Sequence, residues 1–284
     1  MTNIFYVDGE FVAQDDAVVP VTDLSVLRGY GVFDFMRTYG GHPFMLDAHI
    51  ARLRRSAELI DMPVPWTDAE LKAIVLATVA RNPIDEANVR IVVTGGESPN
   101  YLIPDDKPRL IVMVTPSIKN PDHLYADGAS AITVPMSRSD PLAKTINYIG
   151  AIRAMKRARA AGAAEALYLD SAGHVLEGTT TNLFAVFGEV IVTPQDGILP
   201  GITRGVVLDL LEGMYRVEKR ALPLSELLRA DEAFITASNK QVMPIVRVDD
   251  HTIAAGTVGA HTRAIMARYR EFAYGLAWVN NGRG

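Results

Sequence analysis

The segment DPLAKTINYIG, residues 140–150, places a charged side chain where charge is otherwise scarce. Lys144 is the only charged residue between Asp140 and Arg153, and its neighbours are apolar or neutral. Most lysines lie on charge-rich surfaces, because burying an ammonium group is costly. A lysine becomes a nucleophile when its ammonium form is destabilised and the free amine is available. The segment therefore indicates a reactive lysine, with an exposed loop lysine as the plain alternative.

Composition limits the class of protein. The chain has 284 residues, 49% of them hydrophobic, which suffices for two lobes or one large domain and argues against disorder. The net charge of -5 disfavours nucleic acid as a partner. The absence of cysteine excludes disulfides, thiolate catalysis and Cys-based metal sites. There is no run of about 18 apolar residues and no signal-like start, so we expect a cytoplasmic protein without a membrane partner.

Several common catalytic motifs are missing from the chain. No GxGxxG opens a helix after a strand, and there is no Walker loop and no GxSxG element. The six histidines are scattered and HExxH is absent, so we expect no metal site.

Residue patterns predict mixed lobes of strands and helices. A hairpin is expected at Asp8-Gly9, and a later helix begins with a capping box formed by Thr67 and Glu70. Residues 115–129 contain two prolines and few strand signals, and we expect them to connect two lobes. The long crossovers favour an α/β or α+β fold over a sandwich.

Schiff-base chemistry with pyridoxal 5′-phosphate (PLP) would use a reactive lysine. It also needs a carboxylate near the pyridine nitrogen and a cradle for the phosphate. Glu177, in HVLEGTTTNLF, is the candidate carboxylate, with an exposed strand-end residue as the alternative. Among the other lysines, Lys240 is the weaker rival of Lys144.

The stretch PGITRG, residues 200–205, is the candidate phosphate cradle. It lies at a predicted helix start, where free N–H groups and the helix dipole favour an anion. Arg52 could supply charge, although in RLRR it also resembles a solvated arginine. The other candidate phosphate contacts are Ile202, Thr203, Ser238 and Asn239.

Taken together, the motifs resemble the fold type IV PLP enzymes, the class IV aminotransferases, along nearly the whole chain. In chain order they are VDGEFV, GYGVFD, HIARL, the Lys144 segment, LEGTTTN, LPGITRG and ADEAFITAS. The resemblance implies an α/β (α+β) fold of two lobes with the cofactor between them. It divides the chain into a smaller N-terminal α/β domain (1–118), an interdomain loop (119–129) and a larger C-terminal PLP-binding domain (130–284). It also implies a homodimer with active sites near the interface.

The resemblance further implies residue roles. Lys144 matches the lysine that forms the Schiff base and moves the proton, Glu177 the carboxylate at the pyridine nitrogen, and Arg52 the phosphate-binding arginine. The other implied cofactor contacts are Ile202, Thr203, Ser238, Asn182 and Tyr148. Tyr148 stands four residues after the lysine, where the branched-chain enzymes have five. The implied reaction moves an amino group from an α-amino acid to a 2-oxo acid, such as 2-oxoglutarate or pyruvate, by a ping-pong mechanism.

Within this family, the sequence departs from the patterns of the better-known subgroups. VTGGESPN lacks the Arg-x-His element of typical D-amino-acid aminotransferases, and KTINY departs from the Lys-x-Gly-Gly-Asn-Tyr of branched-chain enzymes. DLSVLRGYGVFDF, RIVVTGG and KTINY look most like a less typical group of D-amino-acid aminotransferases, in which other arginines hold the substrate carboxylate. A guanidinium suits that group because it offers two parallel donors. The candidate substrate-binding residues are Arg28, Arg90, Arg37 and Tyr30.

A D-amino-acid aminotransferase is therefore the first hypothesis. An L-branched-chain aminotransferase is the second, followed by an (R)-amine transaminase and by 4-amino-4-deoxychorismate lyase, which would release pyruvate without an acceptor. A non-catalytic binding protein on the same scaffold is disfavoured, because it has no chemical need for both Lys144 and Glu177.

Overall fold

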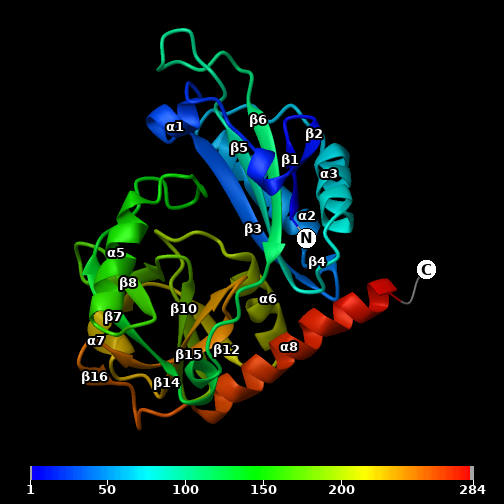
Figure 1. Ribbon diagram of the computed structural model, residues 1–284. Coiled ribbons are helices and arrows are strands. Elements are labelled where there is room, and N and C mark those ends of the chain that lie inside the picture. The colour runs from blue at the N-terminus through cyan, green and yellow to red at the C-terminus, as the bar shows by residue number, and fades with distance from the viewer. Residues whose placement is uncertain (1, 282–284) are drawn as a thin grey trace. The chain divides into compact units, whose positions relative to one another are not determined.

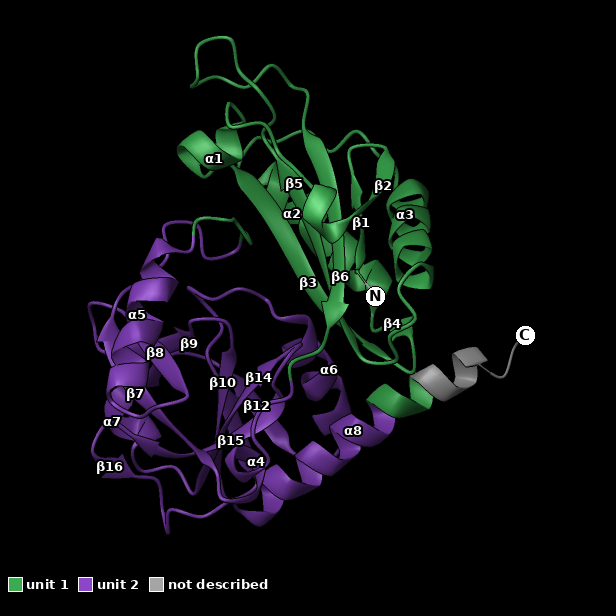
Figure 2. Ribbon diagram, viewed as in Figure 1, with its two compact units in different colours: residues 1–118, 143–147, 273–284 green, residues 119–142, 148–272 purple. Residues whose placement is uncertain are grey.

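The structure is a computed structural model that describes residues 2–281, with side chains up to residue 276. The chain forms two compact units (Figure 2). Unit 1 comprises residues 1–118, 143–147 and 273–284, and unit 2 comprises residues 119–142 and 148–272. The chain first passes from unit 1 to unit 2 between residues 118 and 119. The segments 143–147 and 273–284, which the sequence division assigned to the C-terminal domain, lie in unit 1.

Unit 1 is built on an antiparallel sheet of order β2-β1-β6-β5-β3-β4 (Figure 1). Its strands are β1 (Ile4–Val7), β2 (Glu10–Ala13), β3 (Gly31–Tyr39), β4 (His42–Pro43), β5 (Ala87–Thr94) and β6 (Arg109–Pro116). Its helices are η1 (Gln14–Asp16), α1 (Leu24–Arg28), α2 (Leu46–Glu58) and α3 (Asp68–Ala80). The hairpin at Asp8-Gly9 and the Thr67/Glu70 capping box are confirmed. Most residues of β3 are buried, and α2 packs on this strand, with Val32 and Met36 in one apolar cluster with Ile50 and Leu53.

The segment 143–147 joins unit 1 because it pairs with the start of β3. Thr145 forms a β-bridge with Val32, and Ile146 N–H donates to the Gly31 carbonyl at 3.0 Å. Gly31 permits this approach, since a Cβ atom there would lie 2.8 Å from Ile146 Cδ1 and 3.0 Å from the Val93 carbonyl oxygen. The predicted reactive lysine is thus positioned by a strand more than a hundred residues away in sequence.

The last part of α8 (Ala260–Asn281) also belongs to unit 1. The ring of Tyr274 packs edge-on against Tyr39, with centroids 4.9 Å apart, and its hydroxyl donates to Glu86 at 2.5 Å. Glu86 also pairs with Arg37. Burial, together with the hydrogen bond to Glu86, raises the pKa of Tyr274 to about 12.

Unit 2 contains a mixed sheet that closes on itself, because β9 pairs with β10 as well as with β8. Its strands are β7 (Ala129–Pro135), β8 (Glu165–Leu169), β9 (His174–Gly178), β10 (Asn182–Phe187), β11 (Val190–Thr193), β12 (Arg216–Lys219), β13 (Leu222–Pro223), β14 (Glu232–Ala237), β15 (Gln241–Val248) and β16 (His251–Thr252). Its helices besides α8 are α4 (His123–Ala126), α5 (Ile149–Ala160), α6 (Ile202–Leu211) and α7 (Leu224–Leu227). The closing pair is Glu177 with Asn182, so the fold itself brings these two predicted residues together. No helix within residues 2–281 is long and apolar enough to cross a membrane.

The start of α8 depends on a glycine. The Glu232 carboxylate accepts hydrogen bonds from the N–H groups of His261 and Thr262, at 3.0 and 2.7 Å. A Cβ atom at Gly259 would lie 1.9 Å from Glu232 Cδ. We expect Gly259→Ala to displace this cap and to lower the free energy of unfolding by about 1–3 kcal/mol, measured by urea denaturation.

Gly275→Ala is the matched control, because a Cβ atom there meets nothing within 4 Å. Alanine at this helical position is expected to leave stability unchanged or to raise it by up to about 1 kcal/mol. Equal effects of the two substitutions would contradict the capping role of Glu232.

Candidate functional site

The backbone of Lys144 is held by hydrogen bonds at both its N–H and its carbonyl group. Its N–H donates to Ser56 Oγ at 3.0 Å, and its carbonyl accepts from the N–H of Phe33 at 2.9 Å. Its Nζ lies 4.6 Å from the centre of the Phe33 ring. The side chain is half-buried, so the lysine is oriented by the backbone rather than lying loose on the surface.

Arg52 belongs to a buried ion-pair cluster on α2. Its Nε donates to Asp34 Oδ2 at 2.9 Å and its Nη2 to Asp34 Oδ1 at 2.7 Å. Burial alone would raise the pKa of Asp34, but the charge of Arg52 and the hydrogen bonds from Arg52 and His49 outweigh it and hold that pKa well below its usual range. Burial lowers the pKa of His49, so the neutral ring donates Nδ1–H to Asp34 across 2.6 Å. The guanidinium of Arg52 is therefore fixed in one orientation.

Ser56 links this cluster to the lysine. Its Oγ donates to the Arg52 carbonyl at 2.8 Å and accepts from the N–H of Lys144. Sequence reasoning missed Asp34, His49 and Ser56. For the two helix residues a signal was present, because polar residues stand at 49, 52 and 56, spaced three and four apart, beside the apolar positions 50, 53 and 57.

We expect Asp34→Asn to lower the free energy of unfolding by about 3 kcal/mol or more, because it leaves the buried Arg52 guanidinium without its carboxylate. Asp34 has a lowered pKa in the folded state, so its stabilisation is present above the unfolded value of 3.8 and is lost as pH falls further. The difference between wild type and variant should therefore shrink in acid. Asp47→Asn, in an exposed pair with Lys72, is the control and should cost less than about 1 kcal/mol. A variant as stable as this control would contradict the expected role.

The face of β3 opposite α2 carries aromatic rings and arginine. The guanidinium carbon of Arg90 lies 5.2 Å from the ring centre of Phe33 and 5.5 Å from that of Phe35. Arg90 and Lys144 therefore approach the same phenylalanine. Arg90 is exposed, which leaves its guanidinium accessible to a carboxylate.

The two other predicted substrate arginines lie in different surroundings. Arg28 ends α1, is exposed, and donates from Nη1 to the carbonyl of Leu27 at 3.0 Å. Arg37 is largely buried in its ion pair with Glu86, next to the Tyr39 ring. Its guanidinium is thus engaged in holding unit 1 together.

Tyr30 is half-buried and packs on Gly95, where a Cβ atom would lie 2.4 Å from Tyr30 Cδ1. Its hydroxyl is 3.0 and 3.2 Å from the carbonyl oxygens of Ile60 and Asp61, just beyond α2. Burial raises the pKa of Tyr30, with a contribution from the charge of Asp61. In this structure the hydroxyl anchors the end of α2.

Glu177 is buried in unit 2, and hydrogen bonds to one of its two carboxylate oxygens, Oε2, orient the side chain. Oε2 accepts from Leu199 N–H at 2.9 Å and from Asn182 Nδ2 at 3.4 Å, while Oε1 lies 3.6 Å from Arg138 Nε. Asn182 Nδ2 also donates to the Leu199 carbonyl at 2.9 Å. Gly201 makes room for this amide, since a Cβ atom there would lie 2.1 Å from Asn182 Oδ1. Asn182 therefore orients the Glu177 carboxylate.

The start of α6 has the features of an anion site. Gly201 is the N-cap and supplies no side-chain hydrogen bond, and the helix proper begins with Ile202 and the buried Thr203. Its first N–H groups and dipole favour a negative charge. The helix packs against β14, whose end leads into Ser238.

Tyr148 is the N-cap of α5 and makes no side-chain capping bond. Burial raises the pKa of Tyr168 on β8, and the charges of Glu165 and Glu177 raise it further. Tyr148 adds a smaller contribution to this rise of the Tyr168 pKa.

Lys240, the rival of Lys144, lies in a buried ion pair. Its Nζ is 2.7 Å from Glu165 Oε2. An ammonium group engaged in this way is poorly suited to attack an aldehyde, which favours Lys144 as the reactive lysine.

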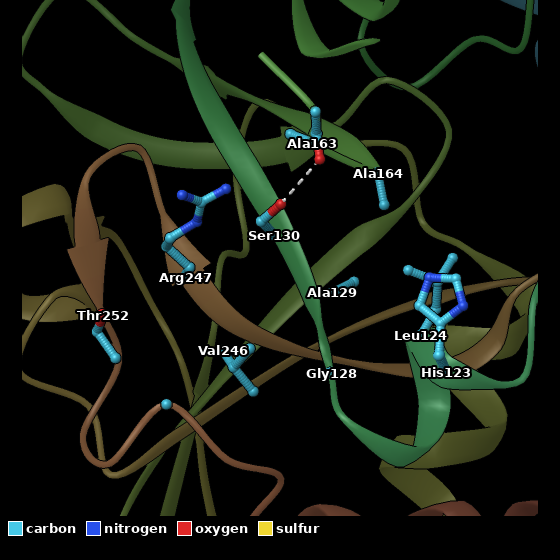
Figure 3. A pocket seen from close by; sticks show the side chains of 12 residues that line it. His123, Leu124, Gly128, Ala129, Ser130, Ala163, Ala164, Val246, Arg247 and Thr252 are labelled. Atoms are coloured by element: carbon cyan, nitrogen blue, oxygen red, sulfur yellow. Dashed lines mark hydrogen bonds between the residues drawn. The ribbon is translucent and has the colours of Figure 1, made fainter.

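An open hollow of about 560 Å³ in unit 2 is lined by residues of α4, β7 and the β15–β16 hairpin, among them Ser130, Arg247 and Thr252 (Figure 3). Ser130 Oγ donates to the carbonyl of Gly162 at 3.4 Å. None of the predicted cofactor residues lines this hollow, so it is separate from the surroundings of Glu177 and Thr203. Among the described residues, no group of three or more His, Cys, Asp or Glu side chains could hold a metal ion.

Comparison with known proteins gives one family. The model of a family described as "Amino-transferase class IV" matches residues 31–248, from β3 to the end of β15. A Methanocaldococcus jannaschii protein named "Putative branched-chain-amino-acid aminotransferase" is 38% identical over 277 residues, covering 94% of this chain and 95% of its own length. A Listeria monocytogenes protein named "D-alanine aminotransferase" is 33% identical over 275 residues, covering 93% and 94%.

Solved structures are similar over the same extent. The branched-chain aminotransferase of Thermoproteus uzoniensis, determined with norvaline, has a TM-score of 0.88 and 30% identity, covering 97% of this chain and 96% of that one. The T.th. branched-chain amino acid aminotransferase, determined with pyridoxamine 5′-phosphate, has a TM-score of 0.89 and 29% identity, covering 97% and 95%.

Proposed function

Because the chain belongs to the class IV aminotransferases and is thus a PLP-dependent transaminase, we propose that it transfers the amino group of a D-amino acid to a 2-oxo acid, with Lys144 as the reactive lysine. One observation carries the choice of an α-amino acid: Lys144 and Arg90 meet at the ring of Phe33. An amine that exchanges with the substrate amino group and a guanidinium that pairs with its carboxylate suit the two ends of such a molecule.

The choice of the D-series rests on sequence. KTINY departs from the pattern of branched-chain enzymes, and proteins named D-alanine aminotransferase align with more than nine-tenths of this chain. Arg90 is the first candidate for the substrate carboxylate and Arg28 the second. Arg37 is not carried into the proposal, because its guanidinium already pairs with Glu86.

The residues present fit PLP. The buried carboxylate of Glu177, oriented by Leu199 and Asn182, suits a protonated pyridine nitrogen. The N-terminus of α6, which has no side-chain cap, suits the phosphate. The other proposed cofactor contacts are Arg52, Ile202, Thr203, Ser238 and Tyr148.

When bound, PLP supplies an aldehyde that takes up the donor amino group and a ring that withdraws electrons as the α-proton leaves. Lys144 would remove the proton from the donor α-carbon as a general base and deliver it, as a general acid, to C4′, the cofactor carbon that carried the aldehyde. Its backbone hydrogen bonds to Ser56 and Phe33 keep the amine oriented between these two tasks. Arg90 holds the substrate carboxylate, and Asp34 holds Arg52 for the phosphate.

Spectral titration of the PLP-loaded enzyme with D-glutamate, D-alanine and L-leucine tests the substrate assignment. We expect the D-amino acids to convert the cofactor to its pyridoxamine form and L-leucine to do so at least about tenfold less efficiently. If L-leucine alone converts the cofactor to its pyridoxamine form, the enzyme is an L-branched-chain aminotransferase instead.

The second candidate is an L-branched-chain aminotransferase. It is favoured by the relative at 38% identity and by the solved structures of branched-chain enzymes. Adding 2-oxoglutarate or pyruvate to the converted enzyme then identifies the acceptor. Pyruvate release without an acceptor would instead point to a lyase.

We further propose that the enzyme is a homodimer. Unit 1 exposes large apolar side chains on two segments, residues 18–26 and 101–103. They are Val18, Val21, Val26, Tyr101, Leu102 and Ile103. The chain around the first segment adjoins the start of the loop that carries the second, since Leu24 N–H donates to the Gly96 carbonyl at 2.8 Å. Such a concentration marks an interaction surface. Light scattering should give twice the chain mass of 30.9 kDa, and a double substitution L102E/I103E should give the monomer; a monomeric wild type would refute the proposal.

A further inference from the structure

Unit 2 contains a buried group of polar side chains that the proposed chemistry does not use, here called the Glu165 cluster: Glu165, Thr179, Thr181 and Lys240. Glu165 is fully buried at the first position of β8. Its Oε2 accepts from Lys240 Nζ at 2.7 Å and from Thr181 Oγ1 at 3.1 Å. Its Oε1 accepts from the N–H and the hydroxyl of Thr179, at 3.1 and 2.5 Å.

The cluster holds the loop that separates Glu177 from Asn182. Within this loop, Gly178 N–H donates to the Thr181 carbonyl at 2.8 Å. A Cβ atom at Gly178 would lie 2.1 Å from Thr181 Oγ1 and 3.0 Å from Glu165 Cδ. A glycine is therefore required for the loop to approach the buried carboxylate.

The cluster also holds the turn 238–240 between β14 and β15. Asn120 Nδ2 donates to the Asn239 carbonyl at 2.9 Å, and the Tyr125 hydroxyl donates to the Lys240 carbonyl at 3.0 Å. The ion pair with Glu165 fixes the Lys240 side chain as a third point. The turn that carries Ser238 is thus restrained at two backbone carbonyls and at the Lys240 side chain.

Stability alone gives a poor reason for this arrangement. Two charges lose their hydration on burial, and apolar residues of similar volume often stabilise a fold equally well. What the ion pair supplies instead is a defined distance between β8 and the turn, which lie 75 positions apart in sequence at Glu165 and Lys240.

We propose that Lys240 is a positioning residue for the cofactor phosphate: through Glu165 it fixes the turn that presents Ser238. This inference rests on the proposed function, in which Ser238 contacts the phosphate. Lys240 acts through the turn, so its loss should weaken binding of PLP but leave binding of pyridoxal, which has no phosphate, nearly unchanged.

The test measures dissociation constants of PLP and pyridoxal for the full-length chain after removal of its cofactor. Lys240→Met removes the ammonium but leaves a buried carboxylate, which can impair folding. The double variant K240M/E165Q leaves no buried charge in the Glu165 cluster and decides the question if the single variant does not fold. We expect both to weaken PLP binding about tenfold or more, with pyridoxal changed less than about threefold. Lys72→Met, in an exposed pair, is the matched control and should change neither constant.

A double variant that keeps the wild-type ratio of the two dissociation constants would overturn the inference. If both constants rise by the same factor, the role of Lys240 is purely structural. Wild-type protein that binds PLP with its Schiff base on Lys144 upholds the proposed function in either case. Wild-type protein without this linkage would overturn the proposed function itself.

Discussion

Lys144→Ala is expected to lower the transamination rate by about 10⁴-fold or more. The substitution removes the amine that we propose both to hold the cofactor and to move the α-proton, and a positioned general base alone contributes about 10²–10⁴-fold. The measurement is the initial rate with D-alanine and 2-oxoglutarate at saturating PLP. Ala143 is buried and Thr145 is bound to β3 through the backbone, so the segment should keep its conformation in the variant.

Borohydride reduction of the wild-type enzyme, followed by peptide mapping, locates the reactive lysine independently. The label should appear in the peptide that contains Lys144. Lys72→Ala serves as the control for the rate and should be fully active, because this lysine is exposed on α3. A label on Lys240, or an active Lys144→Ala enzyme, would refute the assignment.

Arg90→Gln is expected to lower kcat/KM for D-alanine by about 10- to 100-fold. A charged hydrogen-bonding pair is worth about 1.5–3 kcal/mol, and glutamine supplies neither the charge nor the second donor. The loss should be specific to the carboxylate, so the wild-type preference for D-alanine over D-alaninamide should largely disappear. PLP content should stay unchanged, because Arg90 is not among the proposed cofactor contacts.

Arg81→Gln provides a matched control for this prediction. Arg81 also lies over an aromatic ring, 3.7 Å from the centre of Phe11 to its guanidinium carbon, but it is not a candidate for substrate binding. Its kcat/KM should equal that of wild type. If Arg90→Gln behaves like this control, Arg28 becomes the candidate residue for binding the substrate carboxylate. An Arg28→Gln variant would then be tested with D-alanine and D-alaninamide.

The sequence was sufficient for the family, the two-lobed fold type and the cofactor chemistry, because these depend on an ordered set of motifs. The family match confirms that reading. The hairpin at Asp8-Gly9 and the Thr67/Glu70 box were predictable for another reason: both are local, and a few neighbouring residues decide them.

Non-local relationships were not predictable in this way. Asp34 gains its role only when β3 and α2 pack together, and Glu165 meets Lys240 only when the sheet of unit 2 has formed. Arg37 illustrates the converse. Its residue type suited a substrate carboxylate, but its engagement with Glu86 follows from the pairing of distant strands. Residue type therefore identifies a candidate for substrate binding, and the packing determines whether its charge is already paired within the protein.

The allocation of residues 143–147 to unit 1 limits how this enzyme can be recombined with its relatives. A chimera joined at 118/119 would set Lys144 against a foreign first sheet, whose equivalents of Gly31 and Val32 must still pair with the backbone of residues 145 and 146. The same allocation bears on biosynthesis. Unit 1 stays incomplete until the segment around Lys144 has left the ribosome, and the contact of Tyr39 with Tyr274 must wait for more than a hundred further residues. Exchange of whole lobes therefore requires three segments to be transplanted together.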